Sequence, residues 1–139
     1  MGRSIFGLTP KLSLKTLVVQ AENDMGDPAE IFQEVVAGLN LSAAEIDRLD
    51  ENLILERDDS QTGEELTKEL EQLVAETRPD IVLLNPLLSF IRDDIAKQAV
   101  CSKYLRSWLN PISARYGCVW ICMHCSGKAC CVTSSRTLL

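Results

Sequence analysis

The sequence has no apolar run long enough to cross a membrane and no apolar core of a secretory signal. Its longest apolar run, Cys118–Met123, is far shorter than the roughly 20 residues that a transmembrane helix needs. The opening residues MGRSIFGLTP hold no signal-peptide core, and Phe6 stands where N-myristoylation requires Ser or Thr. These absences predict a cytoplasmic protein with no membrane partner.

Basic charge is also scarce. Lys and Arg together number 14 against 20 Asp and Glu, which gives a formal net charge of −6. Binding to a nucleic-acid backbone needs clustered Lys and Arg, so we do not expect the chain to bind nucleic acid by itself. A role in a nucleic-acid machine whose basic surface lies on other parts stays open. The acidic run Glu56–Asp59 is interpreted as a solvated turn.

Short apolar segments alternate with helical patterns along the 139 residues, a length suited to one domain. The segments are continuously apolar, which is typical of strands in a sheet covered on both faces. Strands that alternate with helices predict parallel strands joined by right-handed crossovers. We therefore expect an α/β fold of three layers, a mostly parallel sheet flanked by helices. The predicted strands are Leu14–Ala21, Asn52–Glu56, Ile81–Leu84 and Cys118–Met123.

The predicted helices carry recognisable start signals. Asp27 precedes a proline and predicts the start of the first helix. Capping-box patterns, in which a hydroxyl residue is followed three positions later by Glu, begin at Ser42 and Thr62 and predict the next two helices. The last helix is predicted over Asp94–Arg115, with a kink or break at Pro111 because proline lacks the backbone N–H.

Polar residues follow three of the predicted strands. Glu22, Asn85 and His124, the one histidine of the chain, each come shortly after an apolar segment. Any one of them alone is most often a turn residue. In parallel α/β sheets, however, ligands bind beyond the carboxyl ends of the strands. An acid, an amide and an imidazole in these three positions together predict a site at one edge of the sheet.

These segments resemble successive motifs of RecA-like, AAA-type ATPases of the plasmid RepA helicase family. The motifs are QAEND at Gln20–Asp24, DIVLLNPL at Asp80–Leu87 and HCSGK at His124–Lys128. The resemblance runs from about Phe6 to Lys128. It implies a partial RecA-like P-loop NTPase core over residues 5–128, and we expect residues 129–139 to be a disordered tail.

The resemblance also implies roles for single residues. Glu22 matches the glutamate that orients or deprotonates the attacking water, and His124 matches a sensor of the γ-phosphate. Asn85 takes the place of the Walker B aspartate that holds magnesium through water, and Lys128 ends the sensor motif on the nucleotide side. The implied cofactors are ATP and Mg²⁺. The implied partners are DNA, reached through a complete assembly, and further subunits of a homo- or hetero-oligomer.

The sequence departs from the family in ways that weaken catalysis. Asn85 lacks the negative charge that a hard divalent cation prefers, and Cys125 replaces the second histidine of the sensor pair. The phosphate-binding motif G-x-x-x-x-G-K-[ST] is absent, since Gly7–Lys11 lacks its spacing. The resemblance places that loop upstream, so we expect a reading frame truncated before the P-loop. The missing strand is expected to leave a gap between the strands of Ile81–Leu84 and Cys118–Met123. Either residues near Ser4–Lys11 fill this gap imperfectly, or a partner supplies the strand, or the fragment is unstable.

The functional hypothesis is a fragment of an ATP-binding protein linked to DNA replication or unwinding, with weak or no hydrolysis of its own. The alternative is a non-catalytic interaction module that assembles with complete ATPase subunits. A small zinc or redox protein is less favoured. On a strand, Cys118 and Cys122 lie about 13 Å apart, too far to share one ion. A cluster of Cys122, His124, Cys125 and Cys130 needs the strand to end early, and buried thiols are the simpler interpretation.

Overall fold

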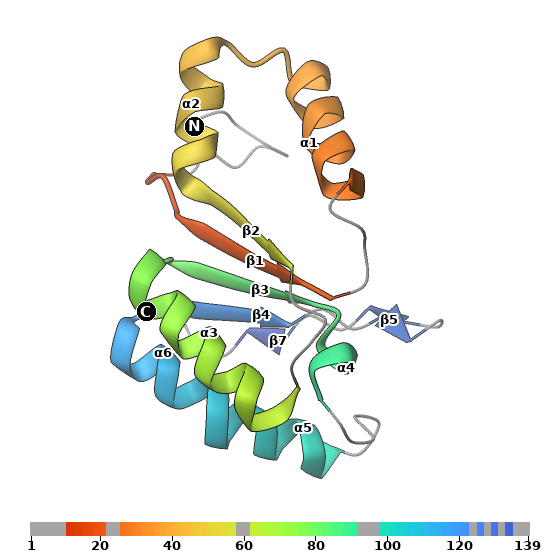
Figure 1. Cartoon of the computed structure of the whole chain (residues 1–139), viewed down its shortest axis with the longest axis vertical. Coiled ribbons are helices and arrows are strands. Elements are labelled where there is room, and N and C mark those ends of the chain that lie inside the picture. The colour runs from red at the N-terminus through yellow and green to blue at the C-terminus, as the bar shows by residue number, and fades with distance from the viewer. Residues whose placement is uncertain are drawn as a thin grey trace.

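A parallel sheet forms the centre of the computed structural model, which describes residues 11–21, 26–57, 62–91, 98–122, 125–126, 129–130 and 133–134. The main strands run in the order β2-β1-β3-β4, all parallel (Figure 1). All four predicted strands are therefore confirmed. They are β1 (Thr16–Gln20), β2 (Leu53–Arg57), β3 (Ile81–Asn85) and β4 (Val119–Cys122).

Three short strands lie late in the chain. β7 (Thr133–Ser134) pairs antiparallel with the outer edge of β4. β5 (Cys125–Ser126) and β6 (Ala129–Cys130) form a separate antiparallel pair. The remaining positions of 129–139, the expected tail, lie outside the described residues.

Helices flank the sheet, as the alternation of patterns predicts. The helix predicted over Asp94–Arg115 is present from Gln98, and its residues 94–97 lie outside the described part of the chain. Directly before Pro111 it passes through a wide π-helical turn, in which the Asn110 N–H donates to the Leu105 carbonyl. The wider turn directly before the proline accommodates a residue that cannot donate to the ordinary α-helical ladder. The helices are α1 (Gly26–Gly38), α2 (Ala43–Asn52), α3 (Gly63–Thr77), α4 (Leu87–Phe90), α5 (Gln98–Tyr104), the π segment η1 (Leu105–Leu109) and α6 (Asn110–Tyr116).

The core lies between one face of the sheet and the helices α3, η1 and α6. Trp120 is buried at its centre, and its indole N–H donates to the Leu109 carbonyl at 3.0 Å. This bond satisfies the only polar group of a large apolar side chain. The sheet contributes Leu17, Val19, Val82, Leu84, Trp120 and Cys122, and the helices contribute Leu66, Leu70, Val74, Leu109 and Ile112.

The opposite face of the sheet is covered less completely. Burial alternates along β1, β3 and β4, so that Val18, Leu83 and Ile121 on this face are only half-buried. α1 and α2 lie together on the β2 side of the sheet (Figure 1), and none of their described side chains is buried. Ile31 and Val35 of α1 are 56% and 46% exposed. The expectation of a sheet covered on both faces is therefore met on one face and only in part on the other.

The expectation of a gap between the strands β3 and β4 is wrong. β3 pairs directly with β4, with Ile81 opposite Val119 and Leu84 opposite Cys122. Two neighbouring apolar edges lower their free energy by satisfying each other's backbone N–H and C=O groups, so the strands close on each other. The sheet is continuous without a further strand between them.

The two capping-box predictions have different outcomes. At Ser42 the pattern is confirmed, because the backbone N–H of Ser42 donates to Glu45 Oε2 at 2.9 Å and its hydroxyl donates to the same oxygen at 2.7 Å. At Thr62 it is wrong: the side chain makes no cap hydrogen bond, and Oγ1 is buried without a partner in the described structure. Gly63 has a φ of 67°, outside the helical region, and this turns Thr62 away from the first N–H groups of α3.

The burial of the core predicts that two leucines contribute very differently to the free energy of unfolding. Leu70 is 2% exposed and Leu12 is 75% exposed. Leu70→Ala is expected to lower the free energy of unfolding by about 2–5 kcal/mol, because it removes buried methyl groups and leaves a cavity. Leu12→Ala, the matched control, should change it by less than about 0.5 kcal/mol. Urea unfolding followed by circular dichroism measures both, and equal losses would contradict the assignment of the core.

The different hydrogen bonding of Ser42 and Thr62 predicts different effects of their substitution on stability. Ser42→Ala should lower the free energy of unfolding by about 0.5–2 kcal/mol, since it removes a hydroxyl of the capping box of α2. Thr62→Val should leave it unchanged or raise it, because the lost hydroxyl is buried and has no partner among the described residues. Thermal unfolding of the two variants beside the parent chain checks this order. A larger loss at Thr62 than at Ser42 would reverse the interpretation.

Candidate functional site

The candidate site lies at the edge where β1, β3 and β4 end. Gln20 at the end of β1 is in register with Asn85 at the end of β3, and the Ala21 N–H donates to the Asn85 carbonyl at 3.1 Å. Leu84 is in register with Cys122 at the end of β4. Because the three strands are parallel and consecutive, the segments that follow them leave the sheet at the same edge.

Of the predicted site residues, only Asn85 belongs to the described part of the chain. It is half-buried, and the alternation along β3 places it on the opposite face from buried Leu84. Glu22 and His124 each come two residues after the last residue of β1 and β4, and Lys128 comes later; all three lie outside the described residues. The structure thus brings together the strand ends that precede the predicted residues, and the positions of those three side chains stay predictions.

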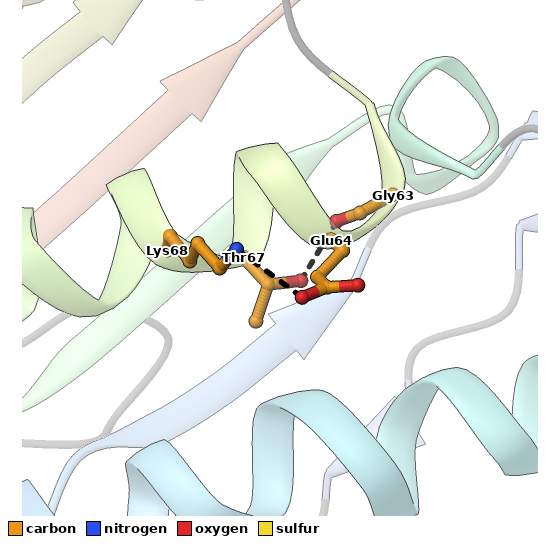
Figure 2. Close-up of polar contacts among 4 residues, drawn as sticks. All are labelled: Gly63, Glu64, Thr67 and Lys68. Atoms are coloured by element: carbon orange, nitrogen blue, oxygen red, sulfur yellow. Dashed lines mark hydrogen bonds and ion pairs between the residues drawn. The ribbon is translucent and has the colours of Figure 1, made fainter.

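The start of α3 lies at the same edge, because α3 returns antiparallel to the strands after β2. Figure 2 shows its first turn, where the Thr67 hydroxyl donates to the Gly63 carbonyl at 2.8 Å and Lys68 Nζ pairs with Glu64 Oε1 at 3.2 Å. Glu64 and Glu65 are both in this turn. Carboxylates at a helix N-terminus suit the helix dipole but repel an anion. This helix end is therefore a poor cradle for phosphate, although helix starts often bind it.

The described residues at this edge offer few ligands for a metal ion. They contain no group of three or more His, Cys, Asp or Glu side chains placed to hold an ion. Asn85 offers a neutral amide oxygen, a weaker ligand for Mg²⁺ than a carboxylate. The described residues thus fit a magnesium ion poorly.

Behind the end of β4, Tyr104 is buried on the core side of the sheet. It is 3% exposed, and its ring meets Trp108 edge-on with centroids 4.9 Å apart. Within the part of the chain that the structure describes, its hydroxyl has no hydrogen-bond partner. Burial raises the pKa of Tyr104 well above its usual value, ionisation of Cys122 would raise it further, and nearby Thr67 lowers it slightly. The group is neutral at any physiological pH.

Two of the cysteines, Cys118 and Cys122, fit the interpretation as buried thiols. Cys118 and Cys122 are 1% and 2% exposed, as expected for buried thiols of a strand. Cys125 and Cys130 are opposite each other in the backbone register of β5 and β6. Their side chains and His124 lie outside what the structure describes, so the four-residue cluster stays untested.

Two hollows lined by described residues lie away from Asn85. The larger, of about 410 Å³, runs between α3 and β2; we call it the α3 groove. The smaller, of about 250 Å³, lies near the start of β1 and β2, at the opposite edge from the strand ends. Sequence reasoning missed the groove, although glutamates seven residues apart beside the apolar stripe of α3 are a signal of it. The groove is lined by Val19, Leu70 and Leu73 on its floor and by Glu56, Glu69 and Glu76 on its rim.

No family model matches this sequence, and a search of curated proteins finds no match. Within the described ranges, no helix has the length and apolar character to cross a membrane.

The buried tyrosine predicts a pH dependence of stability. Because its pKa is raised in the folded chain, the unfolded chain loses the Tyr104 proton first, near the ordinary pKa of about 10. The contribution of Tyr104 to the free energy of unfolding is therefore fully present below about pH 10. It falls as the pH rises further, by up to about 1.4 kcal/mol per pH unit. The free energy of unfolding should fall more steeply between pH 9 and pH 11 in the parent chain than in Tyr104→Phe.

Urea unfolding at pH 9, 10 and 11 measures this difference. Tyr116→Phe controls for the loss of a tyrosine hydroxyl near the same core. If the parent chain and Tyr104→Phe fall with the same slope, the buried hydroxyl does not titrate as described.

Proposed function

We propose that this chain is part of a RecA-like ATP-binding protein of the RepA helicase type, linked to DNA replication or unwinding in the cytoplasm. One observation carries the proposal: β1, β3 and β4 are neighbouring parallel strands, and Glu22, Asn85 and His124 come at or just after their ends. A ligand at this edge of a parallel sheet meets residues that follow all three strands.

Within this proposal, each residue has a stated task. Glu22 orients the attacking water or accepts its proton, and His124 and Lys128 contact the phosphates of ATP. Asn85 would hold the water shell of a magnesium ion. The amide of Asn85 does this weakly, and the first turn of α3 presents carboxylates rather than a phosphate cradle. We therefore propose weak nucleotide binding and little or no hydrolysis by this chain alone.

The direct pairing of β3 with β4 favours a second candidate function. A sheet that is continuous without a P-loop strand does not need one to form. Exposed Ile31 and Val35 on α1 add apolar surface that an assembly could cover. This candidate is a non-catalytic module that binds complete ATPase subunits. It predicts co-elution with a complete RepA-type subunit in gel filtration without any nucleotide requirement.

The position of Asn85 allows a test by gain of function. Asn85→Asp restores a carboxylate at the proposed magnesium position and should raise the affinity for a fluorescent ATP analogue about ten-fold in Mg²⁺, with no gain in EDTA. Asn110→Asp, an exposed site on α6, is the matched control for the added negative charge. Fluorescence titration with and without Mg²⁺ measures both variants.

Other outcomes separate the two candidates. If the parent chain, Asn85→Asp and Asn110→Asp bind the analogue equally with and without Mg²⁺, the proposed nucleotide site is contradicted. The interaction module is then the remaining candidate. Phosphate release at high protein concentration is expected at background level. A clear rate that Glu22→Ala abolishes would mean that the chain is a working ATPase.

A further inference from the structure

The α3 groove is a surface on the helix-covered face of the sheet, beside the middle and end of α3. In its floor, Val19 and Leu70 are 1% and 2% exposed, and Leu73 is half-buried. α3 packs over the centre of this face, while Ile54 of β2 is only half-buried. Neighbouring strands are about 4.8 Å apart, so a helix about 10 Å wide covers two of them. Among the described residues, the part of this face over the edge strand β2, beside α3, is therefore left open.

The charges on the rim of the α3 groove determine which kind of helix complements it. Among the described lining residues, Glu56, Glu69 and Glu76 stand on the rim with one cation, Arg57, so the carboxylates exceed the guanidinium by two. The last turn of α3 holds no basic residue, and its dipole adds a partial negative charge at that end. The Glu76 carboxylate is held by a hydrogen bond of 3.0 Å from Gln72 Nε2. An apolar floor within an acidic rim complements a ligand that is apolar in the middle and basic on its flanks.

We propose that the α3 groove binds an amphipathic helix of a partner protein, with leucine-like side chains on one face and lysine or arginine beside them. The apolar side chains lie against half-buried Leu73, over the floor that Leu70 and Val19 close, and the basic side chains reach Glu56 and Glu76. A second copy of this chain fits less well, since its net charge of −6 repels the same rim.

This surface is separate from the proposed nucleotide edge. Val19 in the floor precedes Gln20, which is in register with Asn85. Side chains of successive strand residues point to opposite faces. Asn85 therefore lies on the other face of the sheet, and a variant of the groove rim leaves it untouched. The docking proposal stands or falls independently of ATP binding.

Fluorescence anisotropy with a labelled 14-residue peptide tests the proposal. The probe carries Leu at helical i, i+3, i+4 and i+7 spacing and Lys elsewhere. One control peptide replaces each Leu with Ser and keeps the charge; another replaces each Lys with Glu. We expect the Leu/Lys peptide to bind the parent chain and both controls to bind at least about ten-fold more weakly, because each lacks one of the two complementary features.

Paired charge reversals then locate the bound peptide. Glu56→Lys with Glu76→Lys should weaken binding at least about ten-fold. The matched control, Glu34→Lys with Glu51→Lys, makes the same change in net charge at exposed positions on α1 and α2 and should stay within about three-fold. Lysine in the last turn of α3 suits the helix dipole, so the groove variant is expected to fold normally.

Each remaining outcome overturns the proposal. Equal weakening by the two charge-reversed pairs would mean non-specific attraction to an acidic protein. Equal binding of the Ser/Lys peptide would mean that the apolar floor takes no part. A concentration-dependent dimer, seen by sedimentation and lost in Glu56→Lys with Glu76→Lys, would assign the groove to a second copy instead.

Discussion

The in-register parallel pairing of β1 with β3, and of β3 with β4, is the constraint on which the rest of the structure depends. It sets which side chains share a face, since a shift of one residue would exchange every buried side chain for its neighbour. In the observed register, Leu17 stands beside Val82 and Val82 beside Trp120, all below 2% exposed. The same register brings the ends of three strands to one edge. Core and candidate site thus follow from one set of backbone hydrogen bonds.

The two faces of this sheet differ in ways that separate stability from recognition. α3, η1 and α6 bury one face, where the indole of Trp120 is anchored to Leu109. On the other face Val18 and Leu83 remain half-buried, and α1 exposes Ile31. Most of the apolar burial that stabilises the fold therefore lies between α3, α6 and the sheet. The half-covered face and the edge of the well-packed face are the places left for binding.

Local patterns in the sequence were sufficient for the strands and for the Ser42 cap, because both depend on neighbouring residues. They failed at Thr62, where the positive φ of Gly63 overrides the capping pattern. The gap expected between β3 and β4 followed from the family resemblance rather than from a local pattern, and it is wrong because the two strands pair directly. For the site, the order of motifs gave Asn85 a place at the strand ends, while the positions of Glu22 and His124 stay predictions. The α3 groove was not predicted because Glu56 and Glu76 of its rim come from different elements, β2 and α3.

The closed pairing of β3 with β4 also limits how a phosphate-binding strand could join this sheet. Insertion between these strands would break a ladder of four residue pairs, from Ile81 opposite Val119 to Leu84 opposite Cys122. Addition at the outer edge of β4 would displace only the two pairs made with β7. Each lost pair leaves backbone groups that need new partners, so the outer edge of β4 is the less costly position.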